Sequence, residues 1–451
     1  MQTPQKIAVV GSGLVGTLLA VYLKKIGHTV HVFDRSPDIR TIEFSGRSIN
    51  LVMSDRGWET LEKIGFAEEI KKIGIPVDKR AIHMQDSKLN YQYYGKEGEA
   101  IYSLSRGVLN RKMIELAEAA GVEFFFEHRV WDVTLSEATL HIGETERGEW
   151  KQLKYDKVFG ADGAFSRIRH RMQRQSMFNY SQEFMNIGYK ELHIPANPDG
   201  THKIDKHSLH IWPRGDFMLM ALSNPDGTFT CTLFMPFEGE NSFEQLKDEE
   251  SLVSFFAEYF PDTKEVIPDL VYDFFKNPTS YLVMMKCFPW TYQDKIALIG
   301  DSAHAIVPFY GQGMNAGFED ITVLGEMIEK YDDDWKQIFS EYEKSRKPNA
   351  DAIAELSYQN FIEMSAKTAD EKFLLQKDIE KWFSDKHPDL WMPLYSRVTF
   401  SLQPYSEALA IGNIQDQIMN EVLALDNIEE NWNSPQVENK IIDLINHYKN
   451  V

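Results

Sequence analysis

Three glycines near the N-terminus have the spacing of a phosphate-binding loop. Gly11, Gly13 and Gly16 form a GxGxxG pattern between an apolar stretch and a run with helical periodicity. Glycines let backbone N–H groups at the start of a helix approach a pyrophosphate. Asp34 follows 23 residues after Gly11, where a carboxylate can accept hydrogen bonds from a ribose. The pattern predicts a bound dinucleotide and leaves FAD and NAD as alternatives.

A second motif, GDSAHAIVPFYGQGMNAGFED, covers residues 300–320. Asp301 follows a predicted buried strand at 296–299, where it can hold a hydroxyl of a ribityl chain. Gly313 and Asn315 open a predicted helix, and its N-terminal N–H groups would face the negative charge of a reduced flavin. This motif favours FAD.

A third motif, GADGAFSRIR at residues 160–169, places Asp162 between a predicted strand and a short helix. Asp162 can fix a loop, or an arginine, near the cofactor. His304 lies in the second motif, but a lone histidine beside a cofactor is more often structural. We therefore assign no catalytic side chain. We also assign no metal, because Cys231 and Cys287 form no CxxC pair and no HExxH pattern occurs.

Together the three motifs resemble the group A flavoprotein aromatic hydroxylases, which share the para-hydroxybenzoate hydroxylase fold. Further stretches resemble the kynurenine 3-monooxygenase family, and they lie at residues 46–57, 74–83, 101–110, 209–214, 229–238, 304–320, 361–364 and 393–401. The resemblance implies an FAD-dependent monooxygenase that converts L-kynurenine to 3-hydroxykynurenine, in tryptophan degradation leading to quinolinate and NAD biosynthesis. It also implies non-covalent FAD, NADPH and O2 as co-substrates, and a flavin C4a-hydroperoxide as oxygen donor.

The resemblance assigns individual residues as well. The positions that match the family's clamp for the substrate carboxylate are Arg80, Tyr94, Asn360 and Tyr395. An arginine fork can pair with a carboxylate through two parallel hydrogen bonds, and hydroxyl and amide groups can complete the shell. Taken alone, Arg80 is as well explained as a surface cation, and Asn360 as a core hydrogen-bond partner. Pro308 and Phe309 would line the space between flavin and substrate.

The cofactor positions extend over much of the chain. They are Gly11, Gly13, Val15, Gly16, Phe33, Asp34, Arg35, Ser36, Val52, Arg106, Val130, Asp162, Asp301, Gly313, Met314 and Asn315. No second GxGxxG occurs, so NADPH would bind transiently in a surface cleft. The sequence leaves open NADPH or NADH, the oligomeric state, a related hydroxylase of another aromatic acid, and a flavin-binding redox sensor without turnover.

Strands and helices must hold these residues in place. The N-terminus predicts a strand at 6–10, a helix to about residue 25 and a strand at 29–33. Further strands are predicted at 80–84, 89–94, 122–126, 155–159, 187–194, 208–212, 217–222 and 229–234, and helices at 108–119, 317–330 and 335–366. Pro348 should kink or split the last helix.

Composition limits the class of protein. The 451 residues carry a net charge of −20, so binding to a phosphate backbone is not expected. Two cysteines fit a reducing compartment. Residues 7–23 carry no charge, but their glycine pattern indicates a strand, turn and helix, and no stretch resembles the C-terminal membrane anchor of mitochondrial relatives. We expect a soluble, cytoplasmic protein.

The expected fold class is mixed α/β. A Rossmann-type FAD-binding domain would comprise residues 1–75, 100–180 and 285–330. A mostly antiparallel substrate-binding sheet would comprise residues 76–99 and 181–284, and a helical region residues 331–451. The chemical motifs lie at 11–34 and 300–315, on both sides of the strand-rich middle, so the domains should be interleaved.

Overall fold

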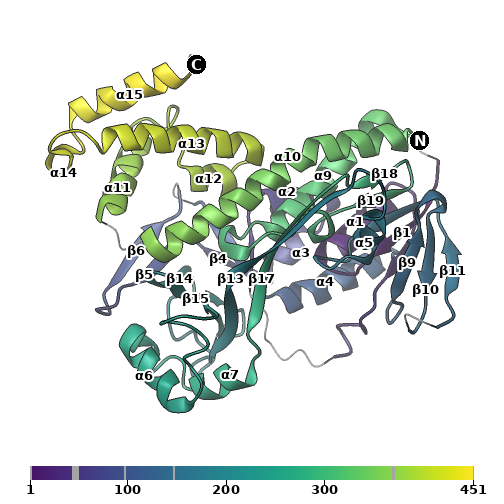
Figure 1. The fold of residues 1–451 in the computed structure, drawn as a ribbon, viewed down its shortest axis with the longest axis horizontal. Helices are drawn as coiled ribbons and strands as arrows, with labels where there is room; N and C mark the ends of the chain where they lie inside the picture. Colours follow the sequence, from purple (N-terminus) through teal and green to yellow (C-terminus); the bar gives the residue numbers. More distant parts are fainter. Residues whose placement is uncertain (1–2, 43–49, 96–97, 146–147, 368–370, 450–451) are drawn as a thin grey trace.

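The computed structural model describes residues 3–42, 50–95, 98–145, 148–367 and 371–449. The first four residues of the 46–57 stretch lie outside this part of the chain. The fold is mixed α/β, as expected, with two large sheets and a helical C-terminal region (Figure 1).

The N-terminal motif belongs to a mainly parallel sheet. In order across this sheet the strands are β18 (Thr291–Tyr292), β19 (Ile296–Leu298), β12 (Lys157–Gly160), β1 (Lys6–Val10), β2 (Thr29–Phe33) and β8 (Glu123–Phe125). β18 runs antiparallel to β19, and the other neighbouring pairs in this sheet are parallel. Because both faces are covered, β1 reads as a continuous apolar run, and Ile7 to Val9 are fully buried. Because β1, β12 and β19 are parallel neighbours, their carboxyl ends lie at the same edge of the sheet.

Helices and two small sheets surround this parallel sheet. The helices are α1 (Leu14–Lys25), α2 (Asp55–Ile64), α3 (Ala67–Lys71), α4 (Arg106–Ala119), α5 (Arg167–Met172), α8 (Asp301–His304) and α9 (Gly313–Tyr331). One small sheet joins β3 (Leu51–Met53), β7 (Ile101–Leu104) and β4 (Ile75–Val77), and the other joins β11 (Lys151–Lys154), β10 (Thr139–Ile142) and β9 (Val130–Thr134). Short 3-10 turns are η1 (Leu135–Glu137), η2 (Pro261–Thr263) and η3 (Pro308–Tyr310).

A second, mostly antiparallel sheet has seven strands. Its order is β17 (Ser280–Phe288), β13 (Asn179–Ile194), β16 (Phe229–Pro236), β15 (Phe217–Ser223), β14 (Ser208–Arg214), β5 (Lys79–His83) and β6 (Leu89–Tyr93). Helices α6 (Glu249–Tyr259) and α7 (Leu270–Lys276) pack near it.

Two of these strands differ from the sequence prediction. β13 begins eight residues before the predicted residue 187, and β17 was not predicted at all. The first half of β13 is largely exposed and lacks a clear apolar alternation, but it forms a ladder with β17. Pairing between distant segments, rather than local pattern, extends the strand.

The C-terminal region is helical and lies beside the seven-stranded sheet (Figure 1). It contains α10 (Trp335–Ile362), a π-helical turn η4 (Glu363–Lys367), α11 (Glu371–Lys386), α12 (Leu394–Thr399), α13 (Tyr405–Val422), α14 (Ile428–Asn431) and α15 (Pro435–Lys449). Pro348 does not split the long helix, because α10 continues through it, and the alternative that it kinks the helix stays a prediction. Buried contacts hold the helix on both sides: Arg346 pairs with α9, and Ile353 packs in the core. In the part of the chain that the structure describes, no helix is long and apolar enough to cross a membrane.

Candidate active site

The loop between β1 and α1 is the predicted phosphate site. Gly11 has a φ of +110°, and a Cβ there would lie 2.3 Å from the carbonyl oxygen of Ala161. A Cβ on Gly16 would lie 2.1 Å from the carbonyl oxygen of Gly11. A Cβ on Gly13 would meet no atom within 4 Å, and Gly13 lines a cavity. Gly11 and Gly16 therefore allow the chain itself to pack, whereas Gly13 keeps space open for a ligand.

Asp34 supports this loop from the end of β2. Its Oδ2 accepts hydrogen bonds from the N–H and the hydroxyl of Ser12, at 2.7 and 2.8 Å, and its Oδ1 accepts one from the Ser36 N–H at 2.8 Å. The carboxylate thus orients the glycine loop, and its contact with a ribose stays a prediction.

The other cofactor residues predicted near the glycine loop differ in solvent exposure. Phe33 is buried and stacks on Phe125, with 5.0 Å between ring centroids. Val130 is also buried, while Arg35 and Ser36 are exposed. Cofactor contacts of these four residues stay predictions.

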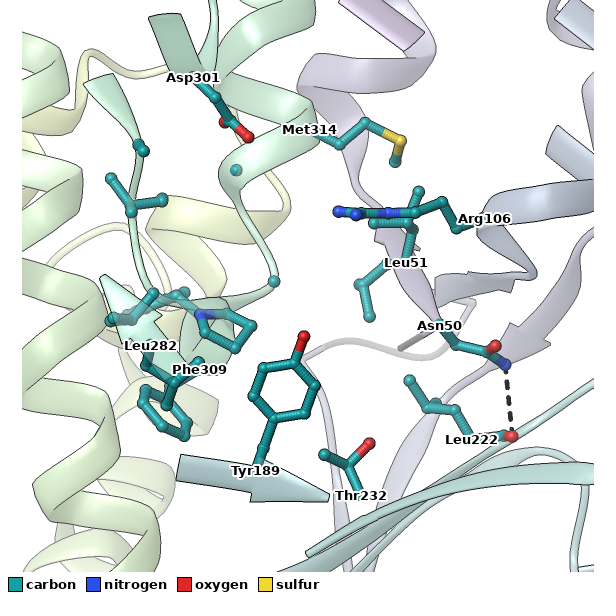
Figure 2. Close-up of a pocket in the computed structure, with 18 of the residues that line it drawn as sticks. Asn50, Leu51, Arg106, Tyr189, Leu222, Thr232, Leu282, Asp301, Phe309 and Met314 are labelled. Carbon is teal, nitrogen blue, oxygen red and sulfur yellow. Dashed lines mark hydrogen bonds between the residues drawn. The ribbon is translucent and has the colours of Figure 1, made fainter. Parts of the chain in front are cut away.

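One cavity of about 680 Å³ runs from the glycine loop to the seven-stranded sheet. Figure 2 shows Asp301 and Met314 on one side of it and Tyr189 and Phe309 on another. The predicted residues that line it are Gly13, Val15, Val52, Arg80, Arg106, Asp301, Pro308, Phe309, Gly313, Met314 and Tyr395. Positions from the cofactor set and from the substrate set thus share a single space.

The flavin end of this cavity combines a helix N-terminus with a carboxylate and a cation. Gly313 and Met314 form the first turn of α9 and line the cavity, so free N–H groups of that turn lie at its wall. Asp301 lines it as the first residue of α8, three residues after β19 ends. Arg106 is the first residue of α4, and its guanidinium points into the cavity (Figure 2). No described residue forms a hydrogen bond or ion pair with the Arg106 side chain, so its guanidinium is available to a ligand.

The Asn315 side chain bonds within the protein, whereas its neighbours Gly313 and Met314 line the cavity. Its Nδ2 donates to the carbonyl oxygens of Val52 and Gly311, at 2.8 and 2.9 Å, and its Oδ1 accepts from the Ser54 N–H at 3.0 Å. The side chain is fully buried and links the start of α9 to β3. Its side-chain amide is thus occupied within the protein, and we expect any flavin contact to come from its backbone.

Asp162 fixes a loop, one of the two roles that the sequence suggested. Its Oδ1 accepts from the Ser166 hydroxyl at 2.5 Å and its Oδ2 from the Arg167 N–H at 2.7 Å. Burial raises the pKa of the Asp162 carboxyl, although these hydrogen bonds work in the opposite direction. The side chain does not line the cavity, but its neighbours Ala161 and Gly163 do.

The proposed carboxylate clamp forms at the far end of the cavity. The Arg80 guanidinium lies 4.7 Å from the ring centroid of Tyr395 and 5.4 Å from that of Tyr94. Tyr395 is stacked between Tyr94 and Tyr310, with centroid distances of 5.1 and 5.5 Å. Within the described residues, the Arg80 Nε is buried without a hydrogen-bond partner, while the Tyr94 hydroxyl interacts with the Arg80 and Tyr395 side chains. A buried donor without a partner is costly, so the Arg80 guanidinium is suited to an anionic group that accepts from it.

Two tyrosines of this cluster remain hydrogen-bond donors at neutral pH. Burial raises the pKa of the Tyr94 and Tyr310 hydroxyls well above the ordinary value. Tyr310 was missed by the sequence analysis, although it lies within the second motif next to Phe309.

Asn360 has partners within the protein. Its Nδ2 donates to the carbonyl oxygen of Phe309 at 2.7 Å and lies 3.2 Å from the Met364 sulfur. The core hydrogen bond weighed from the sequence is thus present. Asn360 holds the Phe309 segment against the clamp, and its direct contact with a substrate stays a prediction.

His304 has the structural role that the sequence analysis favoured. Its Nε2 lies 2.6 Å from Asp320 Oδ2, and its ring stacks on Trp290. Burial works against ionisation of Asp320, but its interactions with His304 and Arg346 lower the pKa of its carboxyl. His304 is therefore occupied in a buried ionic cluster.

Another residue that the sequence analysis missed faces the same cavity. Tyr189, on β13, directs its hydroxyl toward the centre (Figure 2). Its position on a strand that alternates between two faces was the only available signal, and it does not distinguish a ligand contact from ordinary packing.

Comparisons with known proteins agree with this geometry. Residues 5–357 match a family described as FAD binding domain. The fold and the cavity therefore define an FAD-binding protein.

Proteins similar in sequence identify the family more closely. The chain is 75% identical over 445 residues to "Kynurenine 3-monooxygenase" of Flavobacterium johnsoniae, covering 99% of this chain and 100% of the relative. It is 42% identical over 431 residues to the protein of that name from Dictyostelium discoideum, covering 92% and 93%. The chain belongs to the kynurenine 3-monooxygenase family within the FAD-binding proteins.

A solved structure shows the same fold. A 2-methyl-3-hydroxypyridine-5-carboxylic acid oxygenase superposes with a TM-score of 0.68 at 18% identity, covering 83% of this chain and 96% of that one.

Proposed function

We propose that this enzyme hydroxylates L-kynurenine at carbon 3 of its aromatic ring, with NADPH and O2 as co-substrates. The observation that carries the proposal is the Arg80 clamp, which shares one cavity with the flavin end. Kynurenine combines an aromatic amine with an amino-acid side chain, so it offers the clamp a carboxylate and the flavin an electron-rich ring. The high identity to relatives named for this reaction supports the assignment.

The protein's own contribution is positioning and exclusion of water. Bound, reduced FAD supplies the activation of O2. Arg80 would hold the carboxylate, while Pro308 and Phe309 would line the space next to the flavin. Apolar residues from the seven-stranded sheet, including Leu209, Met220 and Phe234, complete the walls and keep water away from the ring. The Asp301 carboxylate and the N-terminus of α9 would hold the cofactor's ribityl chain and pyrimidine edge.

We also propose the interleaved domain division given above. The parallel sheet draws its strands from the three segments assigned to FAD binding, which supports that division. β17 extends the antiparallel sheet past residue 284 to residue 288. A cytoplasmic location belongs to this proposal too, and it is supported by two free, buried cysteines, Cys231 and Cys287.

The direct test is NADPH oxidation by the purified yellow protein, with and without kynurenine, and product identification by mass. We expect a product heavier by one oxygen atom, formed in step with NADPH consumption. Kynurenine recovered unchanged, or oxidation that yields only hydrogen peroxide, would contradict the proposal. 2-Aminoacetophenone, which keeps the aromatic amine and ketone but has no carboxylate, provides a control because it cannot engage the clamp.

A further inference from the structure

The substrate clamp depends on a short helix from the C-terminal region. α12 comprises only six residues and carries Tyr395. A helix this short is not stable by itself, so tertiary contacts must hold it. Whatever holds α12 therefore determines where the Tyr395 hydroxyl lies.

Arg56, on α2, reaches this helix from the flavin side of the molecule. Its side chain is fully buried. Its Nη2 donates to the Gln403 carbonyl oxygen, its Nε donates to the Val398 carbonyl oxygen at 3.4 Å, and its guanidinium lies 3.9 Å from the ring centroid of Tyr405. These partners lie on the last turn of α12, on the following loop and at the start of α13. Carbonyls at a helix C-terminus lack helical partners and carry partial negative charge, so a cation stabilises them.

The charge of Arg56 is balanced within a buried ionic cluster. Glu319 Oε1 accepts from Arg56 Nη1, and Glu319 Oε2 accepts from Arg346 Nη1 at 2.6 Å. The Arg346 Nε donates to Asp320 at 2.7 Å, and Asp320 accepts from the Gly300 N–H at 3.0 Å. The cluster thus connects α12 to the strand end that carries Asp301.

We propose that Arg56 is a positioning residue, which seats α12 so that Tyr395 stands against Arg80 and Tyr94. The inference rests on the proposed function, because Tyr395 matters there as a substrate contact. Arg56 itself does not line the cavity. It acts through Tyr395, and its loss should loosen the clamp while FAD remains bound.

Arg56→Lys tests this with the charge retained. A lysine has no planar fork and cannot serve Glu319, Val398 and Gln403 together. Kynurenine is titrated against the flavin absorbance in the parent, Arg56→Lys, Tyr395→Phe and the double variant. We expect each single variant to raise the dissociation constant roughly three- to tenfold, and the double variant to bind no more weakly than the weaker-binding of the two single variants. Effects that multiply in the double variant would overturn the inference.

Arg346→Lys is the matched control. It alters a second buried arginine of the same cluster, whose bonds go to Glu319, Asp320 and Ala316 rather than to the C-terminal region. It should lower the unfolding temperature, as Arg56→Lys does, while changing the kynurenine dissociation constant less than about twofold. An equal rise in both variants would indicate general loosening and would contradict the specific role of Arg56.

Hydrogen exchange provides a readout that needs no substrate. In the FAD-bound enzyme, amides of residues 394–405 should exchange faster in Arg56→Lys, but not in Arg346→Lys or Tyr395→Phe. If the parent failed to bind kynurenine, the proposed function would be contradicted. The hydrogen-exchange measurement would still decide whether Arg56 holds α12 in place. Parent-like exchange in Arg56→Lys would refute it. If that variant does not fold, Glu319→Gln, which removes the charge partner and keeps the shape, is measured in its place with the same expected result.

Discussion

Gly13 offers the sharpest test of the cofactor site, because its substitution should weaken FAD binding without lowering the stability of the FAD-free protein. Its backbone, at φ −66° and ψ 175°, suits any residue. No atom lies within 4 Å of a Cβ placed there, so Gly13→Val meets no clash within the chain. The added side chain would instead occupy the space next to the first turn of α1, where the pyrophosphate is expected.

The expected magnitude follows from the contacts that would be lost. A hydrogen bond to a charged group contributes about 1.5–3 kcal/mol, and displaced phosphates would lose at least two such bonds to loop N–H groups. A loss of about 3–6 kcal/mol corresponds to a rise of roughly a hundredfold or more in the FAD dissociation constant. Unfolding of the FAD-free variant should occur at or slightly above the parent temperature, because replacing glycine at a compatible φ reduces the entropy of the unfolded chain.

Gly16→Ala is the matched control in the same loop. Its Cβ would lie 2.1 Å from the Gly11 carbonyl oxygen, so it should destabilise the FAD-free protein by about 1–3 kcal/mol or more. Flavin fluorescence quenching measures FAD binding, and thermal unfolding of the FAD-free protein measures stability. Parent-like FAD affinity in Gly13→Val, or FAD-free unfolding as early as in Gly16→Ala, would refute the reasoning.

Three further predictions follow from the clamp and from a buried histidine. Arg80→Met should raise the kynurenine dissociation constant by roughly tenfold or more, since a charged bidentate partner is lost, and Tyr94→Phe should raise it less. Kynurenine is titrated against the flavin absorbance with FAD retained, and a parent-like dissociation constant in Arg80→Met would contradict the clamp. Kynurenine should accelerate flavin reduction by NADPH in stopped-flow measurements, because a clamp that orders on binding can prepare the site; identical rates with and without kynurenine would contradict this gating. Burial lowers the pKa of His210 to about 4 from 6.5. Between these pH values the unfolded chain binds a proton that the folded chain does not, so stability should fall by up to about 3 kcal/mol as pH drops from 6.5 to 4. His210→Gln lacks this group and should flatten the pH dependence of the unfolding temperature; an unchanged slope would show that His210 does not carry it.

The sequence by itself determined the parts of this protein that arise from local pattern. β1, α1 and β2 were predicted at nearly their observed bounds, because a buried strand, a glycine turn and an apolar helix each leave a signature within a few residues. The structural role of His304 was also correctly anticipated.

Other features depended on tertiary structure. Tyr395 lies about 300 residues after Arg80 and Tyr94, and only the docking of α12 brings the three together. The role of Arg56, the inward side chain of Asn315 and the engagement of Asn360 by the Phe309 carbonyl depend on partners distant in sequence. A polar residue has the same local signature whether it faces a ligand or a buried backbone group. Packing between distant segments makes that choice, because it decides which donors and acceptors remain open to the cavity.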